Sequence, residues 1–200
     1  QRSPDWIVAI GGGSVLDTAK AAALIANHQN DVLAFLRGHS QVNAPGIPLI
    51  AVPTTGGSGS EVTPYASITD TRNMRKISLA HDYLYPKYAV LDPSLCLTLT
   101  RRQTAVSGMD ALSHAIEGYW SNQSTPVSDS HALAAIRLMM TYLPEAYRNG
   151  GDLPARHMIM EGSLFAGLTI SNAKTTAVHA VSYPMPVFFH IPHGLACSLV

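Results

Sequence analysis

The chain has 200 residues, of which 46% are hydrophobic and 13% charged, and its formal net charge is zero. A chain with this length and apolar content can bury a substantial core, so the composition favours a globular protein and argues against disorder. It contains no run of Lys or Arg and no apolar stretch of about 18 residues, the features that nucleic-acid binding and a membrane-spanning helix require. We therefore expect small-molecule partners, no nucleic acid and no membrane.

The cysteines and the ends of the chain bear on its compartment and its completeness. Cys96 and Cys197 lie far apart in apolar or small-residue surroundings, unlike the cysteines of a disulfide framework or of a cysteine-based zinc site. A reducing cytoplasm fits this pattern. The chain begins at Gln1 without a signal peptide and ends at Val200 within an apolar pattern, so we interpret it as a fragment of a larger two-domain protein.

In chain order, the first half alternates apolar runs with loops of small residues. Residues 6–10 form an apolar run that ends in three glycines, and residues 48–52 form a second run that ends in a loop rich in Thr, Ser and Gly. Short continuous apolar runs of this kind predict strands of a parallel sheet that are buried on both faces. A helix capped by Ser14 should follow the first strand. Two further short strands are predicted at residues 65–69 and 88–91.

From about residue 98 the pattern is helical throughout. Thr125 and Pro126 suit the N-cap and the first position of a helix, and the segment Asn149-Gly150-Gly151 suits its end. The windows with helical periodicity are residues 101–120, 127–147, 155–170 and 175–182. We therefore predict an α/β half, residues 1–97, followed by an all-helical half, residues 98–200, with ligands in a cleft between them.

Two small-residue loops suggest a phosphate-containing ligand. Gly11, Gly12 and Gly13 stand between a predicted strand and a predicted helix, where the backbone can approach an anion and the helix N-terminus can face it. A glycine cluster alone also fits a tight turn without a ligand. The second loop adds hydroxyl groups at the end of another strand, the position where open α/β sheets bind ligands; these are on Thr54, Thr55, Ser58 and Ser60. Two such loops in one sheet favour a bound pyrophosphate.

A second group of residues suggests a metal ion. Asp110 and His114 lie four residues apart in a predicted helix, so both side chains fall on one face. His179 belongs to a different predicted helix, and His193 stands between a proline and a glycine in a predicted loop. One carboxylate with imidazoles suits a first-row divalent ion such as Fe²⁺ or Zn²⁺. The chain has nine histidines, however, and spacing alone does not choose His179 and His193 over the others.

Four segments of the chain, in order, resemble the iron-containing, or group III, alcohol dehydrogenase family. They are Gly-Gly-Gly-Ser-Val-Leu-Asp-Thr-Ala-Lys at 11–20, Pro-Thr-Thr-Gly-Gly-Ser-Gly-Ser-Glu at 53–61, Ser-Gly-Met-Asp-Ala-Leu-Ser-His-Ala-Ile-Glu at 107–117 and Ile-Pro-His-Gly at 191–194. The resemblance implies a Rossmann-like dinucleotide-binding domain over residues 1–97 and a helical metal-binding domain over residues 98–200. It also implies NAD or NADP, Fe²⁺ or alternatively Zn²⁺, a small alcohol or aldehyde as substrate, and a homo-oligomer.

The resemblance assigns roles to single residues. The metal ligands would be Asp110, His114, His179 and His193. Gly11, Gly12 and Gly13, with Ser14, would meet the pyrophosphate, and Thr54, Thr55 and Ser58 would line the nicotinamide side. Lys76 matches a cofactor-contacting lysine of the family; without the resemblance it would be interpreted as part of a solvated basic cluster with Arg72 and Arg75.

The chain departs from the family at Tyr183, where many members have a second histidine near the nicotinamide. A histidine proton relay is therefore not expected, and Tyr183 is the catalytic candidate at this position. The run at residues 172–184 is similar to phosphonoacetaldehyde reductases within the family, which implies an anionic substrate such as a phosphonate. Lys174 would then meet the anionic group, although a lysine near a helix start is usually only solvated.

The function implied by the resemblance is hydride transfer between a nicotinamide and a carbonyl group polarised by a divalent metal. Two alternatives stay open. One is a polyol dehydrogenase or a dehydroquinate-synthase-like enzyme on the same scaffold; the other is a non-catalytic scaffold segment or an inactive truncated product. The choice between NAD and NADP is also open, because the acidic residue that reads the ribose should precede Gln1.

Overall fold

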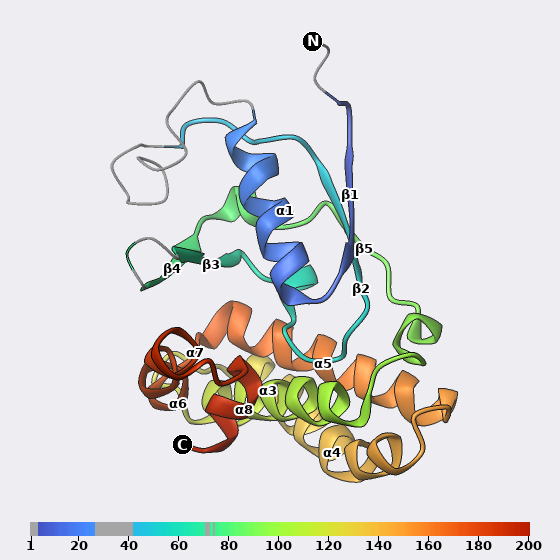
Figure 1. Cartoon of the computed structure of the whole chain (residues 1–200). Helices are drawn as coiled ribbons and strands as arrows, with labels where there is room; N and C mark the ends of the chain where they lie inside the picture. Colours follow the sequence, from blue (N-terminus) through green and yellow to red (C-terminus); the bar gives the residue numbers. More distant parts are fainter. Residues whose placement is uncertain (1–3, 27–41, 71–72, 74) are drawn as a thin grey trace.

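The computed structural model describes residues 4–26, 42–70, 73 and 75–200. Its first part contains a three-stranded parallel sheet in the order β1 (Ile7–Gly11), β2 (Leu49–Pro53) and β5 (Tyr88–Ala89). Helix α1 (Gly13–Ile25) follows β1 directly and packs on the sheet, and the later helices form a separate layer (Figure 1). The predicted order, a parallel α/β part followed by an all-helical part, is confirmed.

The burial of β1 differs from the prediction. Ala9 is buried against α1, but Val8 and Ile10 are 56% and 60% exposed. Because α1 covers one face of β1 and nothing in the described part of the chain covers the other, the expected burial on both faces is wrong for this strand. Ser14 is not the cap of α1 either: the helix begins at Gly13, with Gly12 as N-cap, and has no side-chain cap.

Strand β5 is shorter than the predicted strand at residues 88–91. The Asp92 side chain accepts a hydrogen bond from the Ser94 N–H at 2.9 Å and starts a short 3₁₀ helix, η3 (Pro93–Cys96). This turn ends the strand early and leads the chain down to the helical layer (Figure 1).

A two-stranded hairpin stands apart from the parallel sheet. Strand β3 (Tyr65–Asp70) was predicted, whereas its antiparallel partner β4 (Arg75–Ala80) was not. The hairpin lies beside α1 and carries Lys76 on β4, opposite Thr69. Lys76 therefore belongs to a strand rather than to a loose basic segment; Arg72 lies outside the described residues.

Three long helices make up most of the helical layer, and all three were predicted within a few residues. They are α3 (Arg101–Trp120), α4 (Pro126–Arg148) and α5 (Leu153–Ala173). Thr100 and Thr125 cap the first two through their side-chain oxygens, as the sequence predicted for Thr125. Small residues such as Ala111, Ala135 and Ala166 are fully buried where the helices meet, so the three helices pack closely.

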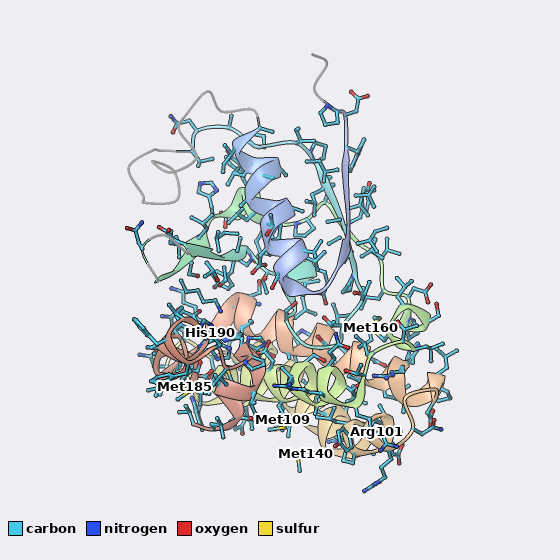
Figure 2. All side chains as sticks on the ribbon, in the orientation of Figure 1. Arg101, Met109, Met140, Met160, Met185 and His190 are labelled. Carbon is cyan, nitrogen blue, oxygen red and sulfur yellow. The ribbon has the colours of Figure 1, made fainter. Side chains whose placement is uncertain are left out.

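Three short helices complete the layer at the end below the hairpin: α6 (Ala177–Ser182), α7 (Pro184–Phe189) and α8 (His193–Ser198). Figure 2 places Met185 and His190 in this region, whereas Met140 of α4 lies on the side of the layer away from α1. His193 is the first residue of α8, not a loop residue as predicted. Within the described ranges, no helix has the length and apolar content needed to cross a membrane.

The loop after β2 joins the two halves through close backbone contacts. A Cβ atom at Gly57 would lie 2.6 Å from the Ser107 carbonyl oxygen of α3, and one at Gly59 would lie 2.5 Å from the Gly167 Cα of α5. Gly59 also has φ +63°, a conformation that side chains disfavour. Glycine at these positions therefore lets the loop lie directly on the helical layer.

Candidate cofactor and metal site

One cavity of ≈ 670 Å³ lies between the α/β part and the helical layer. Its lining includes Gly13 and Ser14 at the start of α1, and Thr55 and Ser58 of the loop after β2. The helical wall carries the four predicted metal residues, Asp110, His114, His179 and His193. The structure therefore brings the glycine loops and the metal residues to one ligand-sized space, at the boundary where the sequence predicted a cleft.

Three of the predicted cofactor residues shape the loops without lining this cavity. The Thr54 N–H donates to the Gly11 carbonyl at 3.0 Å, which ties the two loops together, and the Gly12 carbonyl accepts from the Leu16 N–H at 3.1 Å as α1 begins. The first turn of α1 has no acidic residue and no side-chain cap. The N-terminus of α1 thus presents backbone N–H groups and the positive end of its dipole to an anion.

Two charged residues of α1 hold the loops in place, a role that the sequence did not predict. Lys20 is 2% exposed, and its Nζ donates to the carbonyls of Ser60 at 2.8 Å and Thr63 at 2.9 Å. The Asp17 carboxylate accepts from Ser60 Oγ at 2.6 Å and from the Ser67 N–H at 2.8 Å. Burial lowers the pKa of Lys20 to about 8, although nearby carboxylates act in the opposite direction. A buried lysine among alanines has no signature in helical periodicity, so sequence reasoning missed it.

The predicted metal residues come from three helices. Asp110 Oδ1 of α3 lies 3.7 Å from His179 Nε2 of α6 and 3.7 Å from His193 Nε2 of α8. These three residues and Cys197 form a group whose ligand atoms all lie within 4.8 Å of one another. His114 is adjacent but outside that group: its ring stacks on the ring of His179, with centroids 4.6 Å apart.

Two buried atoms make this arrangement suitable for a cation. Asp110 is 8% exposed and His114 is 5% exposed, yet Asp110 Oδ1 and His114 Nδ1 have no hydrogen-bond partner among the residues that the structure describes. Buried polar atoms without partners are destabilising. A carboxylate oxygen and an imidazole nitrogen can each donate a lone pair to a first-row divalent ion. The residues present therefore fit a bound metal ion.

The charges of the site are strongly coupled. Burial alone would raise the pKa of Asp110, but His114 and the other two histidines outweigh it and hold that pKa well below its usual range. Burial lowers the pKa of His114 to about 4, against the attraction of Asp110. A carboxylate that is ionised and an imidazole that is neutral are the protonation states in which both can bind a cation.

Glu117 fixes the orientation of His179, and sequence reasoning assigned it no role. It has no exposed surface, and its Oε2 is hydrogen-bonded to His179 Nδ1. Its Oε1 accepts from the N–H groups of Thr176 at 2.8 Å and Val178 at 2.9 Å. Burial would raise the pKa of Glu117, but the hydrogen bond to His179 leads the effects that bring it to about 2. With Nδ1 engaged by a carboxylate, His179 presents Nε2 to Asp110.

Cys197 was also missed, because the sequence suggested neither a disulfide nor a cysteine-based metal site. It is 3% exposed, and its Sγ lies 3.7 Å from His179 Nε2, 3.9 Å from His193 Nε2 and 3.3 Å from Ser182 Oγ. Burial would raise the pKa of this thiol, but the neighbouring imidazoles lower it to about 7. The only sequence signal was its position four residues after His193.

The lining of the cavity also includes two lysines and a tyrosine. Lys76 Nζ lies 4.8 Å from the centre of the Tyr183 ring, and Tyr183 lies against His193 with centroids 5.9 Å apart. Burial lowers the pKa of Lys76, while Asp110 acts to raise it. Lys174 lines the same cavity and has φ +63° at the C-cap of α5. The structure thus places Lys76 against Tyr183, and Lys174 lines the same cavity.

Comparisons with known proteins agree along nearly the whole chain. Residues 1–93 match the model of the iron-containing alcohol dehydrogenase family, and residues 104–200 match the model of the C-terminal part of the same family. A long-chain-alcohol dehydrogenase of Geobacillus thermodenitrificans is 43% identical over 194 residues, which cover 95% of this chain and 48% of that protein. The sulfoacetaldehyde reductase of Bilophila wadsworthia is 38% identical over 97% of this chain and 50% of its own length.

Solved structures agree with the sequence comparison. The sulfoacetaldehyde reductase from Bifidobacterium kashiwanohense, in complex with NAD⁺, superposes with a TM-score of 0.93 at 39% identity, over 98% of this chain and 52% of that one. A 1,3-propanediol oxidoreductase superposes with a TM-score of 0.91 at 35% identity. The chain spans about half the length of the curated relatives it matches. The two family matches, the identities and the superpositions show that this chain belongs to the iron-containing alcohol dehydrogenase family.

Proposed function

We propose that the full-length protein is a metal-dependent, NAD- or NADP-linked alcohol dehydrogenase or aldehyde reductase. The observation that carries this proposal is the single cavity that the start of α1 shares with Asp110 and the three histidines. A site for a phosphate-containing cofactor beside a site for a cation is what a metal-assisted hydride transfer requires. Relatives that are named as reductases and dehydrogenases support the same reaction class.

The cofactor would lie along the loops. Its pyrophosphate would face the α1 N-terminus at Gly11, Gly12, Gly13 and Ser14. Its nicotinamide end would point toward Thr54, Thr55, Ser58 and Lys76. The NAD⁺ complex of the related sulfoacetaldehyde reductase supports this part of the proposal.

The cation would be held by Asp110, His114, His179 and His193, as Fe²⁺ or alternatively Zn²⁺. When bound, the cation supplies Lewis-acid polarisation of a carbonyl oxygen, and the nicotinamide supplies the hydride. The residues of the chain do the positioning. Glu117 holds the His179 ring through Nδ1, and the buried Asp110 places a negative charge between two imidazoles.

Tyr183 would take part in proton delivery, since it stands in the cavity beside His193 and under Lys76. Its hydroxyl can donate a hydrogen bond to an alkoxide oxygen. The Lys76 cation over the ring favours negative charge in this corner of the cavity.

We further propose that the substrate is a small aldehyde with an anionic group. Lys76 and Lys174 both line the cavity, so a sulfonate or phosphonate could be paired there while the carbonyl points to the metal residues. Two of the relatives are named as sulfoacetaldehyde reductases, which supports this substrate class. A homo-oligomer and a cytoplasmic location stay predictions.

The test uses the full-length protein, stripped of metal with a chelator and reloaded with Fe²⁺ or Zn²⁺. Oxidation of NADH and of NADPH is followed with sulfoacetaldehyde, phosphonoacetaldehyde and butanal. The expected result is activity only in the loaded protein, with Lys174→Met raising KM for the anionic aldehydes but not for butanal. In His193→Ala we expect loss of metal and a fall in kcat by orders of magnitude, with nicotinamide binding retained.

Other outcomes would favour the alternatives. Oxidation of polyols in place of aldehyde reduction would indicate a polyol dehydrogenase. A carbocyclic product formed without net redox change would indicate a dehydroquinate-synthase-like enzyme. A folded protein that binds neither nicotinamide nor metal would indicate a non-catalytic scaffold, and full activity in the metal-free protein would overturn the metal assignment.

A further inference from the structure

Four residues around the proposed metal site form two helical pairs that face each other. Asp110 and His114 are four residues apart on α3, and His193 and Cys197 are four residues apart on α8. Side chains with this spacing share one helix face. A Cβ atom at Gly194 would lie 2.0 Å from the Val106 carbonyl oxygen of α3, so the two helices touch at this glycine. The close contact brings the face with His193 and Cys197 to the face with Asp110.

The position of the Cys197 sulfur matches that of a ligand. Its Sγ, Asp110 Oδ1 and one ring nitrogen from each of His179 and His193 all lie within 4.8 Å of one another. The sulfur is buried, and it is as close to His179 Nε2, at 3.7 Å, as Asp110 Oδ1 is.

An independent observation points to a ligand at these atoms. Asp110 Oδ1 is buried and has no hydrogen-bond partner in the described part of the chain, although two imidazole nitrogens lie 3.7 Å from it, beyond hydrogen-bonding distance. Atoms that surround one point at these separations, with a carboxylate oxygen left unpaired, are spaced as donors to a shared ion.

We propose that Cys197 is a sulfur ligand of the divalent cation, in addition to the carboxylate and imidazoles. On binding, the Sγ–H bond breaks, the proton passes to solvent and the thiolate lone pair forms the bond to the ion. A thiolate adds a soft, negatively charged donor, so the site should favour thiophilic ions such as Zn²⁺, Co²⁺ and Cd²⁺ over hard ions such as Mn²⁺. This inference rests on the proposed metal site and adds a residue to it.

The first test is the absorption spectrum of the metal-free full-length protein after loading with Co²⁺. A thiolate bound to Co²⁺ gives a charge-transfer band in the near ultraviolet, separate from the visible bands that any bound Co²⁺ shows. We expect this band in the unmodified protein and in Cys96→Ser, because Cys96 lies in η3 and not in the metal group. We expect it to be lost in Cys197→Ser.

The second test compares affinities for Cd²⁺ and Mn²⁺ by competition with a chelator. Cys197→Ser should weaken Cd²⁺ binding by roughly ten-fold or more while changing Mn²⁺ binding little, since supporting residues of metal sites alone account for roughly 10–100-fold. Unchanged selectivity together with an unchanged spectrum would show that Cys197 only packs against the histidines.

The outcomes separate this inference from the proposed function. Visible Co²⁺ bands without the near-ultraviolet band in the unmodified protein would overturn the sulfur ligand and leave the metal site standing. No Co²⁺ binding at all would overturn both. The decisive spectrum is that of the unmodified protein, so poor folding of Cys197→Ser would not leave the inference untested.

Discussion

Replacing Glu117 with Gln should weaken metal binding, although Glu117 is not itself one of the proposed ligands. The amide keeps the shape of the side chain, and its oxygen can still accept from the N–H groups of Thr176 and Val178. Its NH₂ group would then face His179 Nδ1, where the carboxylate oxygen Oε2 now lies. Nδ1 would have to accept a hydrogen bond, so the neutral ring would carry its proton on Nε2. That nitrogen is the one directed at Asp110, and a proton there blocks its lone pair.

The magnitude follows from the role of supporting residues. Loss of the carboxylate partner of a metal-binding histidine weakens metal binding by roughly 10–100-fold, equivalent to about 1.4–2.7 kcal/mol. Buried hydrogen bonds to a charged group contribute about 1.5–3 kcal/mol each. We therefore also expect a lower Tm for Glu117→Gln than for the unmodified protein.

The assay is chelator competition with Zn²⁺ on the full-length protein, beside thermal unfolding of the metal-free form. Glu161→Gln is the matched control, because Glu161 is partly exposed on α5 and lies only 4.0 Å from His157 in a surface pair, an interaction of small energy. If Glu117→Gln bound Zn²⁺ as tightly as the control does, the argument that Glu117 sets the His179 tautomer would be refuted.

Three further changes test other parts of the site. Burial lowers the pKa of Lys20 to about 8, so between about pH 8 and pH 10.5 the unfolded chain holds a proton that the folded chain has released. Unfolding in urea should therefore show the free energy of unfolding of the unmodified protein rising by about 3 kcal/mol relative to Lys20→Met across this window. Parallel pH profiles for the two proteins would contradict this. In Gly13→Ala the new Cβ would lie 2.7 Å from Ser58 Cβ, so the glycine loop and the loop after β2 must move apart. Fluorescence titration should then show roughly ten-fold weaker nicotinamide binding with unchanged metal content. Tyr183→Phe should lower kcat by roughly 100-fold with little change in KM if the hydroxyl delivers the proton, whereas an unchanged kcat would mean that Tyr183 only packs.

Features that depend on a few neighbouring residues could be predicted from the sequence. Thr125 and Pro126 predicted the start of α4, because a side-chain oxygen and a fixed φ act within one turn. The four-residue spacing of Asp110 and His114 placed both on one face of α3 for the same reason. The order of apolar runs and glycine loops predicted the parallel strands and α1.

Features that depend on distant parts of the chain could not be predicted. The apolar pattern of β1 predicts burial on both faces, whereas Val8 and Ile10 are exposed in the described part of the chain. An apolar pattern shows which side chains can be buried, but not which other segments pack against them. Glu117 looked like an ordinary helical residue and Cys197 like a cysteine in an apolar segment, because their roles arise only when α3, α6 and α8 meet. The division at residues 97 and 98 into two domains stays a prediction.

The glycine after His193 explains why a short motif could indicate a site made by long-range packing. A Cβ atom at Gly194 would lie 2.0 Å from the Val106 carbonyl oxygen and 3.0 Å from Asp110 Cβ, so no larger residue fits there unless α8 moves away from α3. Moving α8 would carry His193 away from Asp110, which it now approaches to 3.7 Å. The requirement for glycine and the requirement for a ligand therefore fall on adjacent residues. The Pro-His-Gly segment therefore indicates a tertiary contact within three adjacent residues. Cys197 lies on the same helix face, but no adjacent residue in the sequence indicates that it lies at the site.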